Sequence, residues 1–127
     1  MSFLTPLLKN PVASCRLVNS RTGRIVADRL LTAFDSTTRR IGLLRHDSLP
    51  DGGAMILAPS NAIHTCFMRF NIDVALTTRD GRVIKIRRAL PPWRLTGALR
   101  AYAVIEFRAG ALMQTDTVVG DFLVITV

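Results

Sequence analysis

The sequence predicts an α+β protein, a β-rich single domain with a barrel-like, mostly antiparallel sheet and one short helix. Short runs rich in β-branched and aromatic residues alternate with Gly, Pro and Asp turn signals. One Asp-Gly pair separates two of these runs, and a single segment has a capped helical pattern. The 127 residues suffice for one domain with its own core. We expect residues 1–11 to be a flexible tail and residues 12–127 to be the domain.

The strands are expected where β-branched content lies between turn signals. In chain order they are residues 12–19, 24–32, 54–58, 63–70, 72–78, 82–88, 101–107 and 122–127. The turn between residues 72–78 and 82–88 is the clearest, because Asp80-Gly81 is a pair that two-residue hairpins favour.

The one helix is expected over residues 37–45, after Asp35 or Ser36 as the capping residue. Its residues Ile41 and Leu44 lie on one apolar stripe, and Pro50 confines it.

The composition is strongly basic, with 17 Lys+Arg against 9 Asp+Glu and a net charge of +8. Such a surface attracts polyanions, and guanidinium in particular binds phosphate and carboxylate with two parallel bonds. The sequence has no run of five like charges, which favours arginines scattered over a solvated surface. We therefore rank nucleic-acid binding as unlikely.

The sequence also argues against secretion and membrane spanning. Two cysteines, Cys15 and Cys66, do not make a stapled secreted scaffold, so a reducing compartment is the simpler interpretation. Residues 12–15 match the pattern before a lipid-modified cysteine, but no basic start and apolar stretch precede them, and we treat the match as chance. The longest uncharged run, residues 54–68, is too short and too polar to span a bilayer. A cytoplasmic protein is expected.

A basic loop is the first candidate binding site. Arg87, Arg88 and Arg94 supply positive charge around Trp93, which offers a stacking face, and neighbouring prolines stiffen the segment. The alternative is that Trp93 plugs the open end of the barrel while the arginines stay solvated.

His64, Cys66 and Met68 form a second candidate, because alternate side chains share one face of a strand. Together they are soft ligands suited to Cu(I), and His64 with Cys66 could form a nucleophile and base. Cys and Met are among the most buried residue types, however, which favours packing over metal binding. No orienting carboxylate can be placed, so we predict no catalytic residue, no metal site and no cofactor.

Two carboxylates lie inside apolar strands, Asp73 in Ile-Asp-Val and Glu106 in Ile-Glu-Phe. Each must face solvent or be paired, because an unpaired buried charge is unfavourable. Arg69 and Arg39 are the expected partners, and we favour an ion pair that stabilises the fold over a catalytic role.

Several motifs extend over most of the chain. They are Ala27 with Thr32, Arg39-Arg40-Ile41-Gly42-Leu43-Leu44, Ser48-Leu49-Pro50, Phe67-Met68, Ile72-Asp73, Asp80-Gly81-Arg82-Val83, Val104-Ile105-Glu106 with Ala109-Gly110, and Gly120-Asp121. In this order and spacing, the sequence from about residue 24 onward resembles the bacterial and archaeal domain-of-unknown-function family 192. The resemblance implies a compact β-rich domain with one short helix, and no established activity.

These observations lead to a non-catalytic binding or assembly module, expected to be monomeric, for a protein or a small anionic ligand. The candidate ligand-binding residues are His64, Arg69, Asp73, Arg87, Arg88, Trp93 and Arg94. The alternatives are a small enzyme or soft-metal protein that uses His64 and Cys66, and third a nucleic-acid binder.

Overall fold

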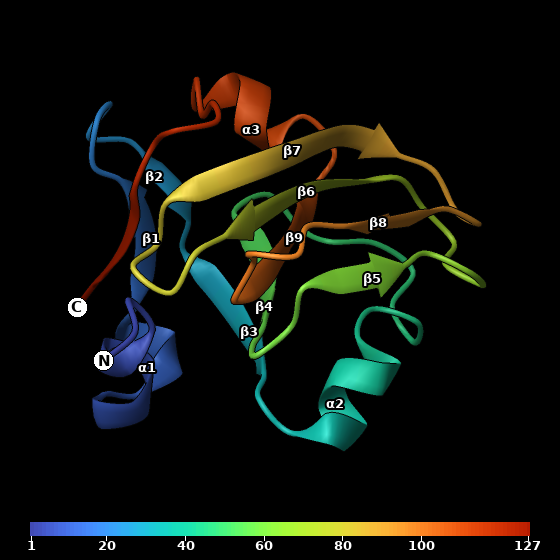
Figure 1. The fold of residues 1–127 in the computed structure, drawn as a ribbon, viewed down its shortest axis with the longest axis horizontal. Helices are drawn as coiled ribbons and strands as arrows, with labels where there is room; N and C mark the ends of the chain where they lie inside the picture. The colour runs from blue at the N-terminus through green and yellow to red at the C-terminus, as the bar shows by residue number, and fades with distance from the viewer.

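The central five-stranded sheet organises the chain, as a computed structural model of residues 1–127 shows (Figure 1). Its strand order is β3 (Arg29–Ala33), β4 (Gly53–Leu57), β9 (Ala103–Arg108), β6 (Ile72–Thr77) and β7 (Val83–Leu90). A three-stranded sheet has the order β10 (Leu123–Thr126), β1 (Arg16–Asn19) and β2 (Ile25–Ala27), and β5 (Ala62–His64) pairs with β8 (Leu95–Gly97).

Strands β3 and β4 are parallel, and the connection between them contains helix α2 (Ser36–Ile41); all other pairs are antiparallel. Two further short helices, α1 (Thr5–Lys9) and α3 (Ala111–Gln114), and a 3₁₀ turn at Val12–Ser14 complete the fold. The β-rich α+β class is confirmed, with three α-helices where one was expected.

Both faces of the central sheet are covered. Along β4, Ala54 and Ile56 belong to one apolar cluster, whereas Met55 and Leu57 belong to another. The first cluster includes residues of α1, α3 and the three-stranded sheet, and the second includes Leu43 and Met68. Because side chains alternate along a strand, the position of each polar residue relative to these apolar residues decides which face of the sheet it lies on.

The Asp80-Gly81 turn joins β6 to β7, as the sequence predicts. Gly81 has φ +91, and a Cβ there would lie 2.4 Å from the carbonyl oxygen of Leu123. Glycine at this position therefore satisfies both the left-handed backbone and the close approach of β10.

Several expected boundaries change because the chain leaves one sheet for another. The run 24–32 divides into β2 and β3, since the amides of Asp28 and Arg29 both donate to the carbonyl of Gly52 and direct the chain toward β4. The expected helix over 37–45 begins at Ser36 and ends after Ile41, at Gly42 with φ +49.

Barrel closure is not found, because the strands form three separate sheets and β3 and β7 are the outer strands of the central one. Where a flexible tail is expected at the N-terminus, helix α1 and the residue before it contribute buried Leu7 and Leu4 to the core. None of the helices has the length and apolar character needed to cross a bilayer.

Candidate functional site

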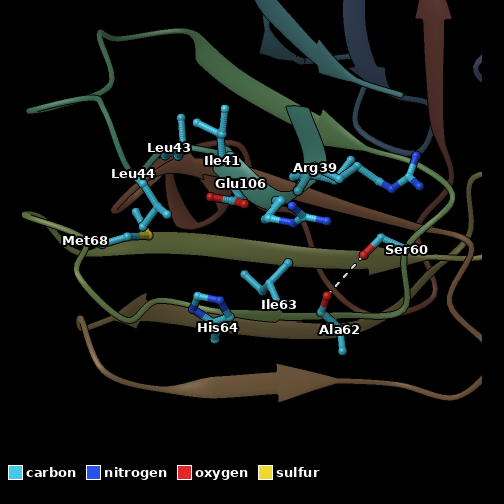
Figure 2. A pocket seen from close by; sticks show the side chains of 13 residues that line it. Arg39, Ile41, Leu43, Leu44, Ser60, Ala62, Ile63, His64, Met68 and Glu106 are labelled. Atoms are coloured by element: carbon cyan, nitrogen blue, oxygen red, sulfur yellow. Dashed lines mark hydrogen bonds between the residues drawn. The ribbon is translucent and has the colours of Figure 1, made fainter. Parts of the chain in front are cut away.

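Glu106 of β9 points into a pocket of about 180 Å³ between α2 and β5 (Figure 2). Its strand places it there by parity: Ile105 and Phe107 pack in the first apolar cluster, so Glu106 faces the opposite side, with Val104. The remaining lining residues come from α2 and the turn after it, from β4, and from the segment around β5: Arg39, Arg40, Ile41, Gly42, Leu43, Leu44, Leu57, Ser60, Ala62, Ile63, His64 and Met68.

The Glu106 carboxyl group is desolvated and lacks a partner. The residue is 4% exposed, its Oε2 atom is buried without a hydrogen bond, and its cross-strand neighbours Met55 and Val74 are apolar. Burial raises the pKa of Glu106 from 4.5 to about 7. The expected pairing of this carboxylate with an arginine is therefore not what the structure has.

Helix α2 forms one wall of the pocket. Its start is fixed by Asp35, whose side chain accepts a hydrogen bond of 2.8 Å from the backbone N–H of Thr38. Of the two capping residues expected, Asp35 and Ser36, the structure thus has Asp35. This backbone hydrogen bond is the main reason that the pKa of Asp35 lies below its usual value. At the other end, Gly42 adjoins the carboxyl group, since a Cβ there would be in van der Waals contact with Glu106 Oε1 at 3.8 Å.

The two arginine side chains of α2 differ in whether hydrogen bonds hold them in place. Arg39 is held, because its guanidinium donates to the carbonyl oxygens of Phe34 at 2.8 Å and Ala58 at 3.4 Å. Arg40 lies at the rim and is exposed to solvent. The pocket thus combines a buried carboxyl group with positive charge at its edge.

His64 and Met68 both line the pocket, His64 exposed and Met68 buried. They do not share a strand face with Cys66, because β5 ends at His64 and Phe67 then turns the chain with φ +67. Cys66 is half-buried and is not among the lining residues. No group of three or more His, Cys, Asp or Glu side chains that could hold a metal ion occurs.

Asp73 lies on the opposite face of the sheet from Glu106. Its carboxylate accepts three backbone hydrogen bonds, from the N–H groups of Ala89 at 2.9 Å and of Gly110 and Leu112 at 3.1 Å each. These amides replace the expected partners Arg69 and Arg39. Asp73 therefore connects the end of β7 to the start of α3, a structural role for a fully satisfied buried carboxylate.

The basic residues expected at a binding site do not line the Glu106 pocket. Arg69 forms an exposed ion pair with Asp47. Arg87 is half-buried on β7, and Arg88 donates to the carbonyl of Thr117 at 3.3 Å.

Trp93 and Arg94 lie in the loop between β7 and β8. Trp93 is 59% exposed, which does not fit a buried plug, and its ring centroid is 4.6 Å from that of Phe67. Arg94 donates to the carbonyl oxygens of Pro92 and Trp93.

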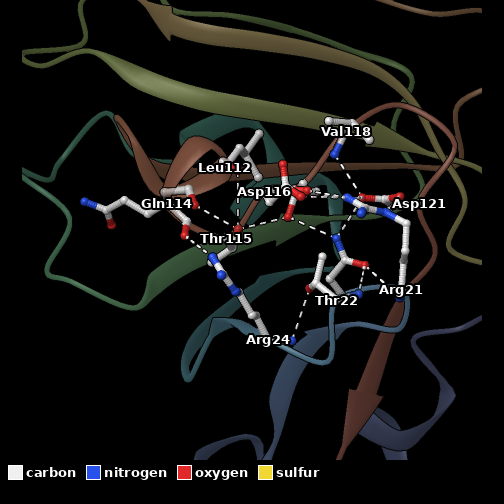
Figure 3. A network of polar contacts seen from close by, with 12 residues as sticks. Arg21, Thr22, Arg24, Leu112, Gln114, Thr115, Asp116, Val118 and Asp121 are labelled. Atoms are coloured by element: carbon white, nitrogen blue, oxygen red, sulfur yellow. Dashed lines mark hydrogen bonds and ion pairs between the residues drawn. The ribbon is translucent and has the colours of Figure 1, made fainter.

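A third buried carboxylate, Asp121, provides a further contrast with Glu106 (Figure 3). It accepts hydrogen bonds from Arg21 Nε at 2.7 Å, from the Asn19 amide at 2.8 Å and from the Val118 N–H at 3.0 Å. The Arg21 bond is the largest cause that lowers the pKa of Asp121 to about 2. Both carboxylate oxygens of Asp121 accept hydrogen bonds from the protein, whereas Glu106 keeps an oxygen atom that could bind a ligand.

The sequence marks Glu106 as a carboxylate within an apolar strand but does not identify it as a residue of the site. The sequence feature that could have indicated this is the polar side chain between Ile105 and Phe107. Because side chains alternate along a strand, Glu106 must face the side of the sheet opposite to these two residues. What covers that face depends on the connection through α2, which the strand pattern alone does not reveal.

The comparisons with known proteins agree with this fold. The family model described as DUF192, "Uncharacterized ACR", matches residues 18–125. Two solved structures are similar with TM-scores of 0.74 and 20% sequence identity: a protein of unknown function from Novosphingobium aromaticivorans and a protein from Sinorhizobium meliloti described as "a putative transcription regulator". Each similarity covers 86% of this chain, and 81% and 89% of the other chain respectively. None of the curated proteins matches the sequence.

Proposed function

This chain belongs to domain-of-unknown-function family 192, a membership that carries a fold without an activity, and we propose that it is a non-catalytic binding module whose small ligand occupies the Glu106 pocket. The structural similarities, at 20% identity, bear on the fold alone. The proposal therefore rests on the chemistry of the pocket.

The carrying observation is the buried, unpartnered Oε2 atom of Glu106. A buried polar atom without a hydrogen bond destabilises a protein by about 1–3 kcal/mol, and more when it is charged. A ligand that donates a hydrogen bond to this atom recovers that free energy on binding. The free energy lost at the unpaired oxygen is therefore recovered on binding and contributes to the affinity.

The pocket restricts the ligand's size and chemistry. Its volume of about 180 Å³ lies below the roughly 300–1,000 Å³ of sites for drug-sized molecules, so the ligand is small. Glu106 requires a hydroxyl or amine donor at the inner end, Ile63 and Leu43 supply apolar walls, and Arg40 favours an anionic group at the rim. A short molecule with a donor at one end and a phosphate or carboxylate at the other fits these demands.

Acid–base catalysis in the same pocket is the second candidate function. One observation favours it, since a carboxyl group with a pKa of about 7 can accept and release a proton near neutral pH. Its partner there would be His64, because Cys66 does not line the pocket.

Glu106 is the single glutamate of the sequence, which makes the test direct. Glutamate labelled with ¹³C at the side-chain carboxyl gives one resonance, which is followed during titration with ethanolamine, glycerol, glycerol phosphate and phosphoethanolamine. We expect a saturable shift with the phosphate-bearing probes. Arg40→Ala should weaken their binding, while Arg45→Ala, an exposed arginine outside the pocket, should not.

If none of these probes moves the resonance, the proposed ligand chemistry is wrong. If the probes are instead chemically converted, and Glu106→Gln abolishes conversion, the second candidate is correct.

A further inference from the structure

Two exposed aromatic side chains, neither of which lines the Glu106 pocket, meet at one end of the molecule. Phe67 is 71% exposed and Trp93 is 59% exposed, and their ring centroids lie 4.6 Å apart. We call this pair the aromatic tip. Leu95, two residues after Trp93, is 74% exposed. Side chains this exposed protrude into solvent rather than line a groove.

Both aromatic residues have an unfavourable backbone conformation. Phe67 has φ +67 and Trp93 has φ +66, a region that bulky residues rarely adopt. Residues persist there only where the surroundings impose it, and such positions cluster at binding sites.

Thr65 supplies the constraint. Its buried hydroxyl donates to the carbonyl of Pro91 at 2.7 Å and accepts from the Arg94 N–H at 2.9 Å, and its carbonyl accepts from the Trp93 N–H at 3.1 Å. The two loops that carry the tip are therefore joined into one unit.

These loops follow β5 and β7 and lie at the right-hand end of the molecule in Figure 1, opposite both chain termini. The tip is thus free of the chain ends and of the three-stranded sheet.

The surroundings of the tip are positively charged. Arg69, two residues after Phe67, is paired with Asp47, whereas three further arginines adjoin the loop after β7 and form no ion pair. Strand β7 leads Arg87 and Arg88 toward the loop, and Arg94 directly follows Trp93. Charge complementarity requires an anionic partner.

We propose that the aromatic tip inserts into the headgroup region of a membrane that contains anionic phospholipid. Phe67 and Trp93 would lie at the boundary with the acyl chains, where aromatic rings are favoured, and the neighbouring arginines would contact lipid phosphates. This inference is independent of the ligand proposed for the Glu106 pocket.

The dimensions of the tip favour a lipid surface over a protein. Two aromatic side chains together bury roughly 300–500 Å², below the roughly 800 Å² per partner of a stable protein interface. A membrane needs no matching groove, because lipid adapts to a small protruding group and the arginines add attraction over a distance. The rings are also inclined by 58° to each other, which does not offer stacked bases one continuous surface.

Trp93 is the single tryptophan, so the intrinsic fluorescence of the whole protein reports on the tip. The protein is titrated with vesicles of phosphatidylcholine alone and of phosphatidylcholine mixed equally with phosphatidylglycerol. We expect a saturable blue shift of Trp93 emission with the mixed vesicles, reversed by added salt, and little change with phosphatidylcholine alone.

Phe67→Ala tests the tip without removing the reporter, and Met113→Ala on α3, which is 71% exposed like Phe67, is the matched control. Phe67→Ala should weaken vesicle binding by about fivefold or more, and Met113→Ala should leave it unchanged. Circular dichroism confirms that both variants are folded.

Absence of a blue shift with the mixed vesicles would overturn the proposal. So would equal binding to both kinds of vesicle, or equal loss in the two variants. A change of emission with oligothymidylate but not with vesicles would assign the tip to nucleic acid instead.

Discussion

Replacing Glu106 by glutamine should stabilise the protein at alkaline pH and leave it almost unchanged at acidic pH. The side chain is buried, and burial raises its pKa from 4.5 to about 7. Below pH 4.5 the carboxyl group is protonated in the folded and in the unfolded chain. Protonated Glu106 and glutamine are then both neutral and similar in shape, so their free energies of unfolding should agree.

Between pH 4.5 and about 7 the unfolded chain loses this proton while the folded protein keeps it. The free energy of unfolding of the native protein therefore falls as pH rises through this window, and it levels off above it. A difference of about 2.5 pKa units, from 4.5 to 7, corresponds to about 3 kcal/mol. Glu106→Gln does not ionise and should escape this loss.

The assay is urea denaturation of both proteins at pH 4.5, 6, 7 and 8, followed by far-ultraviolet circular dichroism. At pH 8 the variant should be more stable by about 3 kcal/mol, or by about 10 °C in Tm for a domain of this size. Arg39, Arg40 and His64 line the pocket in both proteins, so the comparison changes the side chain at residue 106 alone. A constant difference across all four pH values would refute the reasoning.

Three further predictions concern the other buried polar residues. Asp73→Ala should lower the free energy of unfolding by about 2–4 kcal/mol, because three backbone N–H groups lose their acceptor, and urea denaturation measures this. Asp121→Asn should lower the free energy of unfolding by about 1–2 kcal/mol at pH 7. Because the pKa of Asp121 is lowered to about 2, the stabilisation by its carboxylate is present above pH 3.8 and disappears as pH falls toward 2. Unfolding curves recorded at decreasing pH should therefore show the stabilities of the two proteins converge. Thr65→Val should cost about 1–2 kcal/mol and lower the fluorescence anisotropy of Trp93, because the hydroxyl bonds that join the two loops are lost; an unchanged anisotropy would contradict the role assigned to Thr65.

Features of the fold that depend on adjacent residues could be predicted from the sequence, whereas short elements stabilised by distant segments could not. The Asp80-Gly81 hairpin and the cap of α2 depend on a few adjacent residues; the hairpin was predicted, and Asp35 is one of the two capping residues expected. The strand β8 and the helices α1 and α3 were not predicted, because each has only three to five residues and is stabilised by contacts with distant segments.

The candidate site was less predictable. His64 was expected at a site and lines the pocket, but the sequence could not say that α2 would bring Arg40 to the same place. The two carboxylates in apolar strands looked alike in sequence, yet Asp73 meets three amides and Glu106 leaves an oxygen unpaired.

The sequence by itself determined the β-rich class, the basic charge and the alternation that sends Glu106 and Asp73 to their faces of the sheet. Only the tertiary structure decided what each face meets, including the contact of Phe67 with Trp93 across two loops. The physical reason is that side-chain parity is a local property of a strand, whereas the partners of a side chain come from segments that chain connectivity and packing bring together.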